Sequence, residues 1–205
     1  EIVLMHLDFL PLKTNANIIE GNALRMDWES IVPKHKLSYI MGNPPFVGHQ
    51  WRSKAQTDDM KETFYDLLKH GKLDYVASWY QKAADYMRGT KIGTAFVSTN
   101  SIVQGESVGI LWKFLFAKKD VEIQFAYRTF VWISEAKSQA AVHCVIIGFT
   151  CYTSQAKKQL FENDRVRFVE HINGYLIAAP DIFIESRGKQ LTSGFPEMSK
   201  GSQPT

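Results

Sequence analysis

The sequence has 205 residues, of which 45% are hydrophobic, and it carries a formal net charge of +3. This length and apolar fraction predict one globular domain with a sizeable core. The charge is too small to identify a nucleic-acid-binding protein by itself, and it does not exclude DNA as a partner.

Two cysteines, Cys144 and Cys151, lie in or beside an apolar run, with no histidine at metal-ligand spacing. This use of cysteine predicts a reduced intracellular chain without a metal site. No segment approaches the length of a membrane span, and no basic and then apolar leader precedes a small-residue cleavage site. We therefore expect a soluble cytoplasmic protein that has no membrane partner.

Residues 17–24 predict a short strand that ends in Gly-Asn. In a doubly wound sheet, a polar residue just past a strand end can reach a nucleotide base, which makes Asn22 a candidate for binding the adenine of a cofactor. Asp27, a little further on, either caps the next helical turn or lines the same crevice. We favour the cap.

Residues 37–42 form a short, β-prone apolar run that predicts a buried strand. The run is closed abruptly by Asn43-Pro44-Pro45-Phe46. In an open α/β sheet, ligands bind at this carboxyl end of the strands. The tetrapeptide is therefore the first candidate for a catalytic site.

The residue types in this tetrapeptide suit chemistry on an amine that is conjugated to an aromatic ring, as in adenine. Such a nitrogen is a poor nucleophile, but its two N–H groups can donate to the Asn43 side-chain oxygen and to a backbone carbonyl, which localises the lone pair. Pro44 and Pro45 present carbonyls without a competing N–H. Phe46 offers a face for stacking, a contact worth about 1–3 kcal/mol. Taken alone, an Asn-Pro-Pro triplet is also typical of a rigid turn.

Residues 47–54 are polar and basic, and they predict a loop over the active site. In such a loop Arg52 and Lys54 are available to phosphates, although a merely solvated loop fits the pattern equally well.

The next segment has helical spacing from about residue 57 to residue 87, which predicts two helices separated near Gly71. Residues 91–100 are continuously apolar and end in polar residues, as is typical of a buried parallel strand. Residues 110–116 predict a helix that covers the sheet.

Residues 121–127 predict a further strand, followed by the aromatic pair Phe130 and Trp132. Two aromatic faces can sandwich a base that has left its duplex, so this pair and the neighbouring Arg128 are substrate-binding candidates. A polar insert at residues 134–139 then leads into a strongly β-prone, buried strand at residues 140–149.

The character of the chain changes beyond residue 152. A basic run containing Lys157, Lys158, Arg165 and Arg167 precedes a tail rich in Pro, Gly and Ser. We predict a catalytic region at residues 1–152 and an exit segment and linker at residues 153–205. Because the chain begins at Glu1 without methionine and ends in a loop-like run, we expect a piece of a longer polypeptide.

Several sequence blocks, taken together and in this order, resemble the methyltransferase region of MmeI-like enzymes. These are single-chain restriction-and-modification proteins that methylate adenine in DNA. The blocks are residues 21–28, 43–46, 74–83, 96–101, 128–137, 179–181, 185–187 and 196–198. The resemblance covers nearly the whole chain.

The resemblance implies a Rossmann-like α/β fold of class I methyltransferases, which use S-adenosylmethionine (SAM). It implies that Asn43 and the Pro44 carbonyl hold the adenine amino group, while Phe46 and Phe130 sandwich the ring. Asn22 falls where the third motif of the family meets the cofactor, so the candidate cofactor-binding residues are Asn22, Ala23 and Asp27.

One departure from the family concerns the glycine-rich loop that binds the methionine part of SAM, because no Gly-x-Gly occurs in these residues. We therefore expect a truncated sheet that holds strands three to seven, lacks the first two and has an antiparallel last strand. The SAM site is then incomplete and the isolated chain inactive. Loss of neighbouring strands also predicts an exposed sheet edge through which the chain can dimerise.

The leading hypothesis is a DNA methyltransferase that acts on adenine N6 in double-stranded DNA. Methylation of RNA or of a protein glutamine is the alternative within the same chemistry. That glutamine group usually has Tyr after Asn-Pro-Pro, so Phe46 favours a nucleic acid. A catalytically silent scaffold or DNA-contacting module is the alternative from another class.

Overall fold

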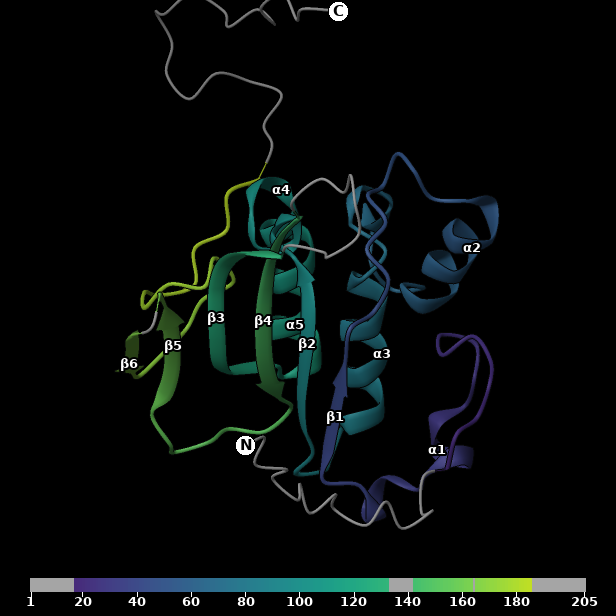
Figure 1. The fold of residues 1–205 in the computed structure, drawn as a ribbon, viewed down its shortest axis with the longest axis horizontal. Coiled ribbons are helices and arrows are strands. Elements are labelled where there is room, and N and C mark those ends of the chain that lie inside the picture. Colours follow the sequence, from purple (N-terminus) through teal and green to yellow (C-terminus); the bar gives the residue numbers. More distant parts are fainter. Residues whose placement is uncertain (1–16, 133–141, 164, 186–205) are drawn as a thin grey trace, which may run out of the picture.

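The computed structural model describes residues 17–132, 142–163 and 165–185. These residues form a mixed sheet of six strands in the order β1-β2-β4-β3-β5-β6 (Figure 1). The strands are β1 (Tyr39–Gly42), β2 (Gly93–Thr99), β3 (Glu122–Trp132), β4 (Val142–Thr150), β5 (Lys158–Glu162) and β6 (Arg165–Val169). The insert expected at residues 134–139 lies outside the described residues.

The strand directions place β4 as an antiparallel strand inside the sheet. β1 runs parallel to β2, and β3 runs parallel to β5. β4 is antiparallel to both of its neighbours, β2 and β3, and β6 is antiparallel to β5. The expected α/β fold with an antiparallel strand is therefore confirmed, and β1, β2 and β3 all point their carboxyl ends to the same edge.

Helical segments connect the strands at the positions that the apolar spacing predicts. The α-helices are α1 (Trp28–Ile31), α2 (Lys54–Thr63), α3 (Ala77–Met87), α4 (Gly105–Ser107) and α5 (Lys113–Lys119). The tighter or wider turns are η1 (Lys34–Lys36), η2 (His70–Lys72), η3 (Asn100–Val103) and the π-helical η4 (Val108–Trp112). Two helices flanking Gly71 and a helix over residues 110–116 are thus confirmed.

The core lies between the sheet and helices α3 and α5, which sit behind it in Figure 1. Tyr80 of α3 is fully buried and stands edge-on to Phe96 of β2, with ring centroids 5.3 Å apart. Its hydroxyl and that of Ser98 lie 2.7 Å apart in a hydrogen bond. This contact satisfies two buried polar groups and fixes α3 on the sheet.

Residues 17–24 do not form the expected strand. Asn22 instead organises a turn, since its side-chain oxygen accepts from the Leu24 amide at 3.0 Å and its carbonyl accepts from the Arg25 amide at 2.9 Å. A short polar side chain that bonds the nearby backbone competes with a strand ladder. The prediction of a strand at residues 17–24 is therefore wrong.

The burial expected for β1 is also wrong, because β1 lies at the edge of the described sheet. Tyr39 and Met41 are 73% and 82% exposed, whereas Ile40 packs against the core. An edge strand presents unpaired backbone N–H and C=O groups that can pair with another chain. Dimerisation through β1 is therefore possible in principle by strand pairing, and it stays a prediction.

The basic segment after residue 152 contributes strands to the same sheet. β5 pairs with β3, and β6 pairs with β5. Residues 158–162 and 165–169 therefore belong to the sheet, while the domain boundary at residue 152 stays a prediction. No helix in the described part of the chain has both the length and the apolar character that crossing a bilayer requires.

Candidate functional site

The Asn43–Phe46 loop leaves the carboxyl end of β1, where Gly42 is paired with Phe96 of β2. Asn43 is exposed, and its side chain forms no hydrogen bond with any residue that the structure describes. Pro44 is buried, and Phe46 is half-buried against the core. The loop therefore holds Pro44 and the Phe46 ring in the protein, while Pro45 and the amide of Asn43 are exposed and open to a ligand.

The aromatic candidates reach the same edge of the sheet through the strand register. Thr99 at the end of β2 pairs with Cys144 of β4, which in turn pairs with Phe130 of β3. Because neighbouring strands lie about 4.8 Å apart, the backbones at Thr99 and Phe130 are about 10 Å apart. The fold thus brings the carboxyl ends of β1, β2 and β3 to one edge of the sheet, so the loop and Phe130 lie at the same edge.

Phe130 and Trp132 lie close together on β3, with ring centroids 6.4 Å apart and planes tilted by 47°. Phe130 and Arg128 line an open hollow of ≈ 750 Å³ beside β5. The Arg128 guanidinium pairs at 2.6 Å with Glu162, which also lines this hollow. An aromatic ring beside a basic group is an arrangement that can contact a base and its phosphate.

The turn at residues 22–25, which carries the candidate cofactor-binding residues Asn22 and Ala23, is hydrogen-bonded to two helices. Asn22 donates to the Asp59 carboxylate of α2 at 3.0 Å, and Lys82 of α3 donates to the Leu24 carbonyl at 2.7 Å. The Ala23 carbonyl accepts from the Trp28 indole at 2.8 Å. Asn22 and Ala23 therefore shape the turn, and Asn22 is exposed.

Asp27 is exposed and caps α1, because its side chain accepts from the Glu29 amide at 3.0 Å. The capping interpretation is confirmed. The structure leaves its role toward a cofactor as a prediction.

The buried Asp59 carboxylate is the shared acceptor of the hydrogen bonds that hold this turn. It is 3% exposed and accepts from Arg25 at 2.6 Å and from Tyr75 at 2.7 Å, in addition to Asn22. Burial acts to raise the pKa of Asp59, but the hydrogen bonds from Tyr75, Arg25 and Asn22 outweigh it and hold the pKa below its usual range. Burial and the neighbouring carboxylate raise the pKa of Tyr75. At neutral pH the cluster therefore holds an ionised aspartate against a neutral tyrosine.

The two phosphate candidates of the following loop differ in their surroundings. Arg52 is half-buried, and its guanidinium donates to the Gly71 carbonyl and contacts the Met60 sulfur. Burial lowers the pKa of Arg52, and the charge of Asp74 acts in the opposite direction. Lys54 is exposed at the start of α2. Of the two, Lys54 has its charge open to solvent, while Arg52 fastens its loop to η2.

Comparison with known proteins decides the family. Residues 2–162 match the family model described as MmeI, DNA-methyltransferase domain. The chain belongs to this family. It is 39% identical over 198 residues to DNA methyltransferase A of Bacillus subtilis (strain 168), with 95% of this chain and 22% of that protein covered.

A solved structure of the type IIL restriction-modification enzyme MmeI in complex with DNA is also similar to this MmeI-family chain. The TM-score is 0.82 at 39% identity, covering 89% of this chain and 25% of that one. The chain therefore spans about a quarter, or less, of the length of both relatives. The expected resemblance to MmeI-like methyltransferases is confirmed.

The sequence did not reveal three buried or half-buried groups that shape the site in this MmeI-family chain: Asp59, Asp74 and Lys82. Asp74 and Lys82 both belong to the block at residues 74–83 that carries part of the resemblance, and that is the signal that could have pointed to them. Asp59 lies within a helical pattern whose apolar spacing drew attention to the core. The partners of Asp59 and Lys82 are distant in the sequence, so spacing alone does not pair them.

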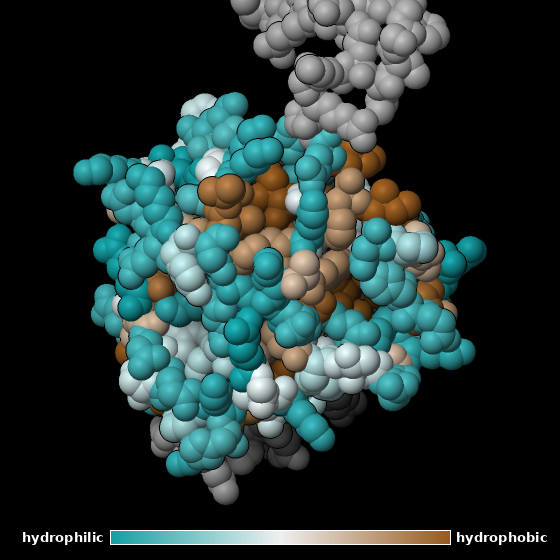
Figure 2. Space-filling view, turned by 180° about the vertical axis from the view of Figure 1, so that it is seen from behind, coloured by the Kyte–Doolittle hydropathy of each residue, from teal (hydrophilic) through white to brown (hydrophobic). Residues whose placement is uncertain are grey.

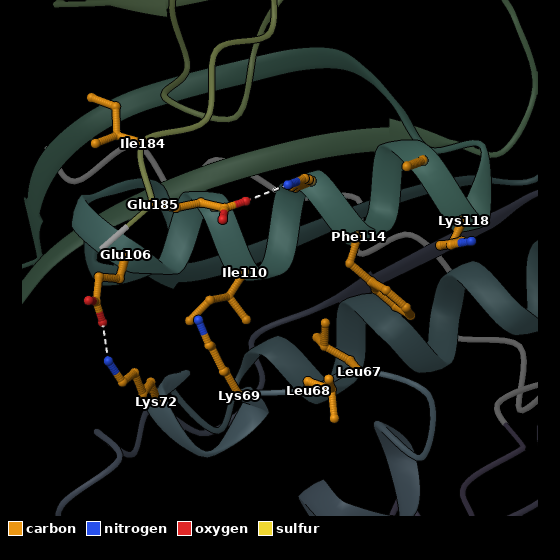
Figure 3. Close-up of a pocket in the computed structure, with 13 residues that line it drawn as sticks. Leu67, Leu68, Lys69, Lys72, Glu106, Ile110, Phe114, Lys118, Ile184 and Glu185 are labelled. Carbon is orange, nitrogen blue, oxygen red and sulfur yellow. Dashed lines mark hydrogen bonds and ion pairs between the residues drawn. The ribbon is translucent and has the colours of Figure 1, made fainter. Parts of the chain in front are cut away.

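An apolar groove lies elsewhere on the molecule, between η2 and the helical segment of α4, η4 and α5 (Figure 3). Hydrophobic side chains gather on the face opposite to the view of Figure 1 (Figure 2). In the groove, which has a volume of ≈ 440 Å³, Leu67 and Phe114 provide apolar surface. Lys72 pairs with Glu106 at 2.5 Å at its rim (Figure 3). None of its lining residues belongs to the Asn43–Phe46 loop, the turn at residues 22–25 or the aromatic pair, so the groove is separate from the candidate site.

Proposed function

We propose that this chain is part of a DNA methyltransferase that transfers a methyl group from SAM to N6 of adenine. One observation carries the proposal: the Asn43 amide is exposed on a loop that leaves the carboxyl end of β1, at the edge that also holds Phe130. Ligands of open α/β sheets bind at this edge. The membership of the MmeI family supports the same chemistry.

The residues of the loop have distinct roles in this proposal. The Asn43 side-chain oxygen and the Pro44 carbonyl accept the two N–H groups of the adenine amine, which favours a tetrahedral nitrogen with a localised lone pair. Burial of the Pro44 ring restrains this carbonyl. Phe46 and Phe130 supply the faces between which the extruded base lies. Extrusion costs a few kcal/mol, and stacking offsets it.

The described residues fit only one end of the cofactor. The exposed Asn22 and Asp27 offer polar groups for its adenosyl end. The sequence contains no Gly-x-Gly for its methionine end. When bound, SAM supplies an electrophilic methyl carbon on a sulfonium centre. The protein leaves the proton of the methylated amine to solvent.

The proposed partner is double-stranded DNA, and Lys54 and Arg128 are the proposed phosphate contacts. The solved structure of MmeI is a complex with DNA, which supports this partner. Both cysteines of the chain are free thiols, Cys144 buried and Cys151 half-buried. Free thiols agree with the proposed cytoplasmic location.

The proposal is tested by the Asn43→Ala variant of the full-length protein. Loss of the amide oxygen is expected to lower the rate of methyl transfer from labelled SAM to duplex DNA by about 100–1000-fold, the usual effect of removing one stabilising group. Asn17→Ala is the matched control, because Asn17 is also an exposed asparagine but lies outside the loop.

The substrate given to the same assay separates the alternatives. The proposal is supported if duplexes that contain adenine are methylated and duplexes in which an analogue without the amino group replaces adenine are not. Methylation of RNA or of a glutamine peptide alone would replace it by the alternative substrate. DNA binding without any transfer would make the protein a silent scaffold. Full activity of Asn43→Ala would refute the assigned role.

A further inference from the structure

Three separate segments of the chain meet at the Asp74 carboxylate. Asp74 is 8% exposed and stands just before α3. Its Oδ1 accepts from the Val47 amide at 3.2 Å and from the Val76 amide at 3.1 Å. Its Oδ2 accepts from the Thr99 hydroxyl at 3.2 Å. One buried carboxylate therefore joins the start of α3, the residue after the catalytic loop and the end of β2.

The contact with Val47 fixes the exit of the Asn43–Phe46 loop. The Val47 amide is held by Asp74, and the Val47 carbonyl accepts from the Tyr75 amide at 3.0 Å. The entry of the loop is held by the ladder of β1, which ends at Gly42 opposite Phe96. Only the four loop residues lie between these two anchors. The path of the backbone at Asn43 and Pro44 therefore depends on where Val47 is held.

The contact with Thr99 ties this exit to the rest of the site. Thr99 pairs with Cys144, and Cys144 pairs with Phe130. The Thr99 hydroxyl also shares a hydrogen bond of 2.7 Å with Ser101. Asp74 thus connects the loop that carries Asn43 to the end of β2, which is separated from Phe130 only by β4. Hydrogen bonds to a charged acceptor are stronger than neutral ones, which suits a fixed connection.

We propose that Asp74 is a positioning residue that holds the Asn43–Phe46 loop in the geometry needed to accept the substrate amine. The inference rests on the proposed function for its catalytic consequence. Asp74 acts through the backbone of Val47, so it shapes the loop without touching the reacting nitrogen. A residue that served only to cap α3 would affect the free energy of unfolding and leave turnover unchanged in the folded protein.

The first test is a set of variants in the full-length protein. Asp74→Ala removes all three contacts, and a displaced catalytic group can cost about 100-fold in rate. We expect kcat to fall by about this factor while KM for SAM stays unchanged, because only an interaction of the transition state is lost. Asp74→Asn keeps an oxygen for the two amides and a polar group for Thr99, so it is expected to restore most of kcat. Thr99→Val removes one contact and is expected to have an intermediate kcat.

The matched control is Asp58→Ala, because Asp58 is an acidic residue of α2 whose ion pair, among the residues that the structure describes, is with Lys61 on the surface. We expect its kcat to equal that of the unsubstituted protein.

The second test measures hydrogen exchange of single backbone amides in the full chain and needs no enzymatic activity. In Asp74→Ala the Val47 and Val76 amides are expected to exchange faster, while the Ala84 amide inside α3 keeps its rate. Unchanged exchange at Val47, or an unchanged kcat, would overturn the inference. General acceleration throughout α3 that Asp74→Asn does not reverse would overturn it too. If the unsubstituted protein transfers no methyl group, the proposed function fails. Faster hydrogen exchange of the Val47 amide in Asp74→Ala would even then show that Asp74 holds the loop.

Discussion

Asp59 accepts hydrogen bonds from Asn22, Arg25 and Tyr75, although it is almost fully buried. These bonds hold its pKa below the usual range in the folded chain, against the opposing effect of burial. The ionised form is therefore favoured by folding. The resulting stability is fully present above the unfolded pKa of about 3.9 and is lost as the pH falls through the lower, folded pKa.

Asp59→Asn is expected to lower the free energy of unfolding by about 1–3 kcal/mol at pH 7, because three donors lose a charged acceptor. The difference from the unsubstituted chain is expected to shrink as the pH falls below about 4, because protonation of Asp59 in the unfolded chain then begins to favour unfolding of the unsubstituted protein. Urea denaturation at a series of pH values from 7 to about 3 measures this. Asp58→Asn, at a half-exposed surface pair, is the control and is expected to change stability little. A constant difference at all pH values would contradict the argument.

Side-chain roles were predicted from the sequence where local chemistry determines them. Asp27 caps α1, as its position before a helical turn predicts. The contacts of Asp59 with Asn22 and of Asp74 with Val47 join residues 37 and 27 positions apart. Such contacts arise when the sheet and its helices assemble, so spacing in the sequence does not specify them.

Between elements, β3 and β4 come into unusually close contact where Phe125 lies across from Gly148. The two residues are paired in register, and a Cβ atom added at Gly148 would overlap the Phe125 ring. Gly148→Ala is therefore expected to lower the free energy of unfolding by about 1–3 kcal/mol, the usual cost of overpacking. Thermal or urea unfolding measures the change.

The control for this substitution is Gly71→Ala, because a Cβ atom at Gly71 meets nothing within 4 Å. It is expected to leave stability unchanged or to raise it slightly, since alanine loses less backbone entropy on folding. Equal effects of the two substitutions would show that a general cost of replacing glycine, and not the Phe125 ring, determines the result.

Helices with regular apolar spacing were predicted well from the sequence. The burial of a strand, which depends on the elements beside it, was not. The helices around Gly71 follow from apolar spacing, because one face of each must meet the core. The apolar run of β1 predicted burial on both faces, yet Tyr39 and Met41 are exposed at the edge of the described sheet. An apolar run specifies a strand, but the strands and helices beside it decide how deeply it is buried.

At the scale of the molecule, the sheet collects the candidate residues at one edge. The ends of β1, β2 and β3 carry the Asn43–Phe46 loop, Thr99 and Phe130. The general rule for open α/β sheets predicted this edge from the sequence.

The last prediction concerns SAM binding by residues 1–205 alone. The turn at Asn22 is shaped by Asp59 and Lys82 within the chain, so the surface proposed for the adenosyl end of the cofactor is already formed. The methionine end needs a glycine-rich loop whose backbone N–H groups face the ligand, and no Gly-x-Gly is present. Isothermal titration calorimetry of the chain with SAM is expected to show no binding at micromolar concentrations.

The positive control is the full-length protein, which is expected to bind SAM with a Kd in the micromolar range, equivalent to about −8 kcal/mol. If the isolated chain loses most of the free energy of SAM binding that the full-length protein has, the contacts with the methionine end of the cofactor provide most of the affinity. Tight binding by the chain alone would contradict the claim of an incomplete site. In that case the Asn22→Ala variant shows whether the turn provides the affinity for SAM. The substitution removes the Asn22 amide and, with it, the hydrogen bond to Asp59 that shapes the turn.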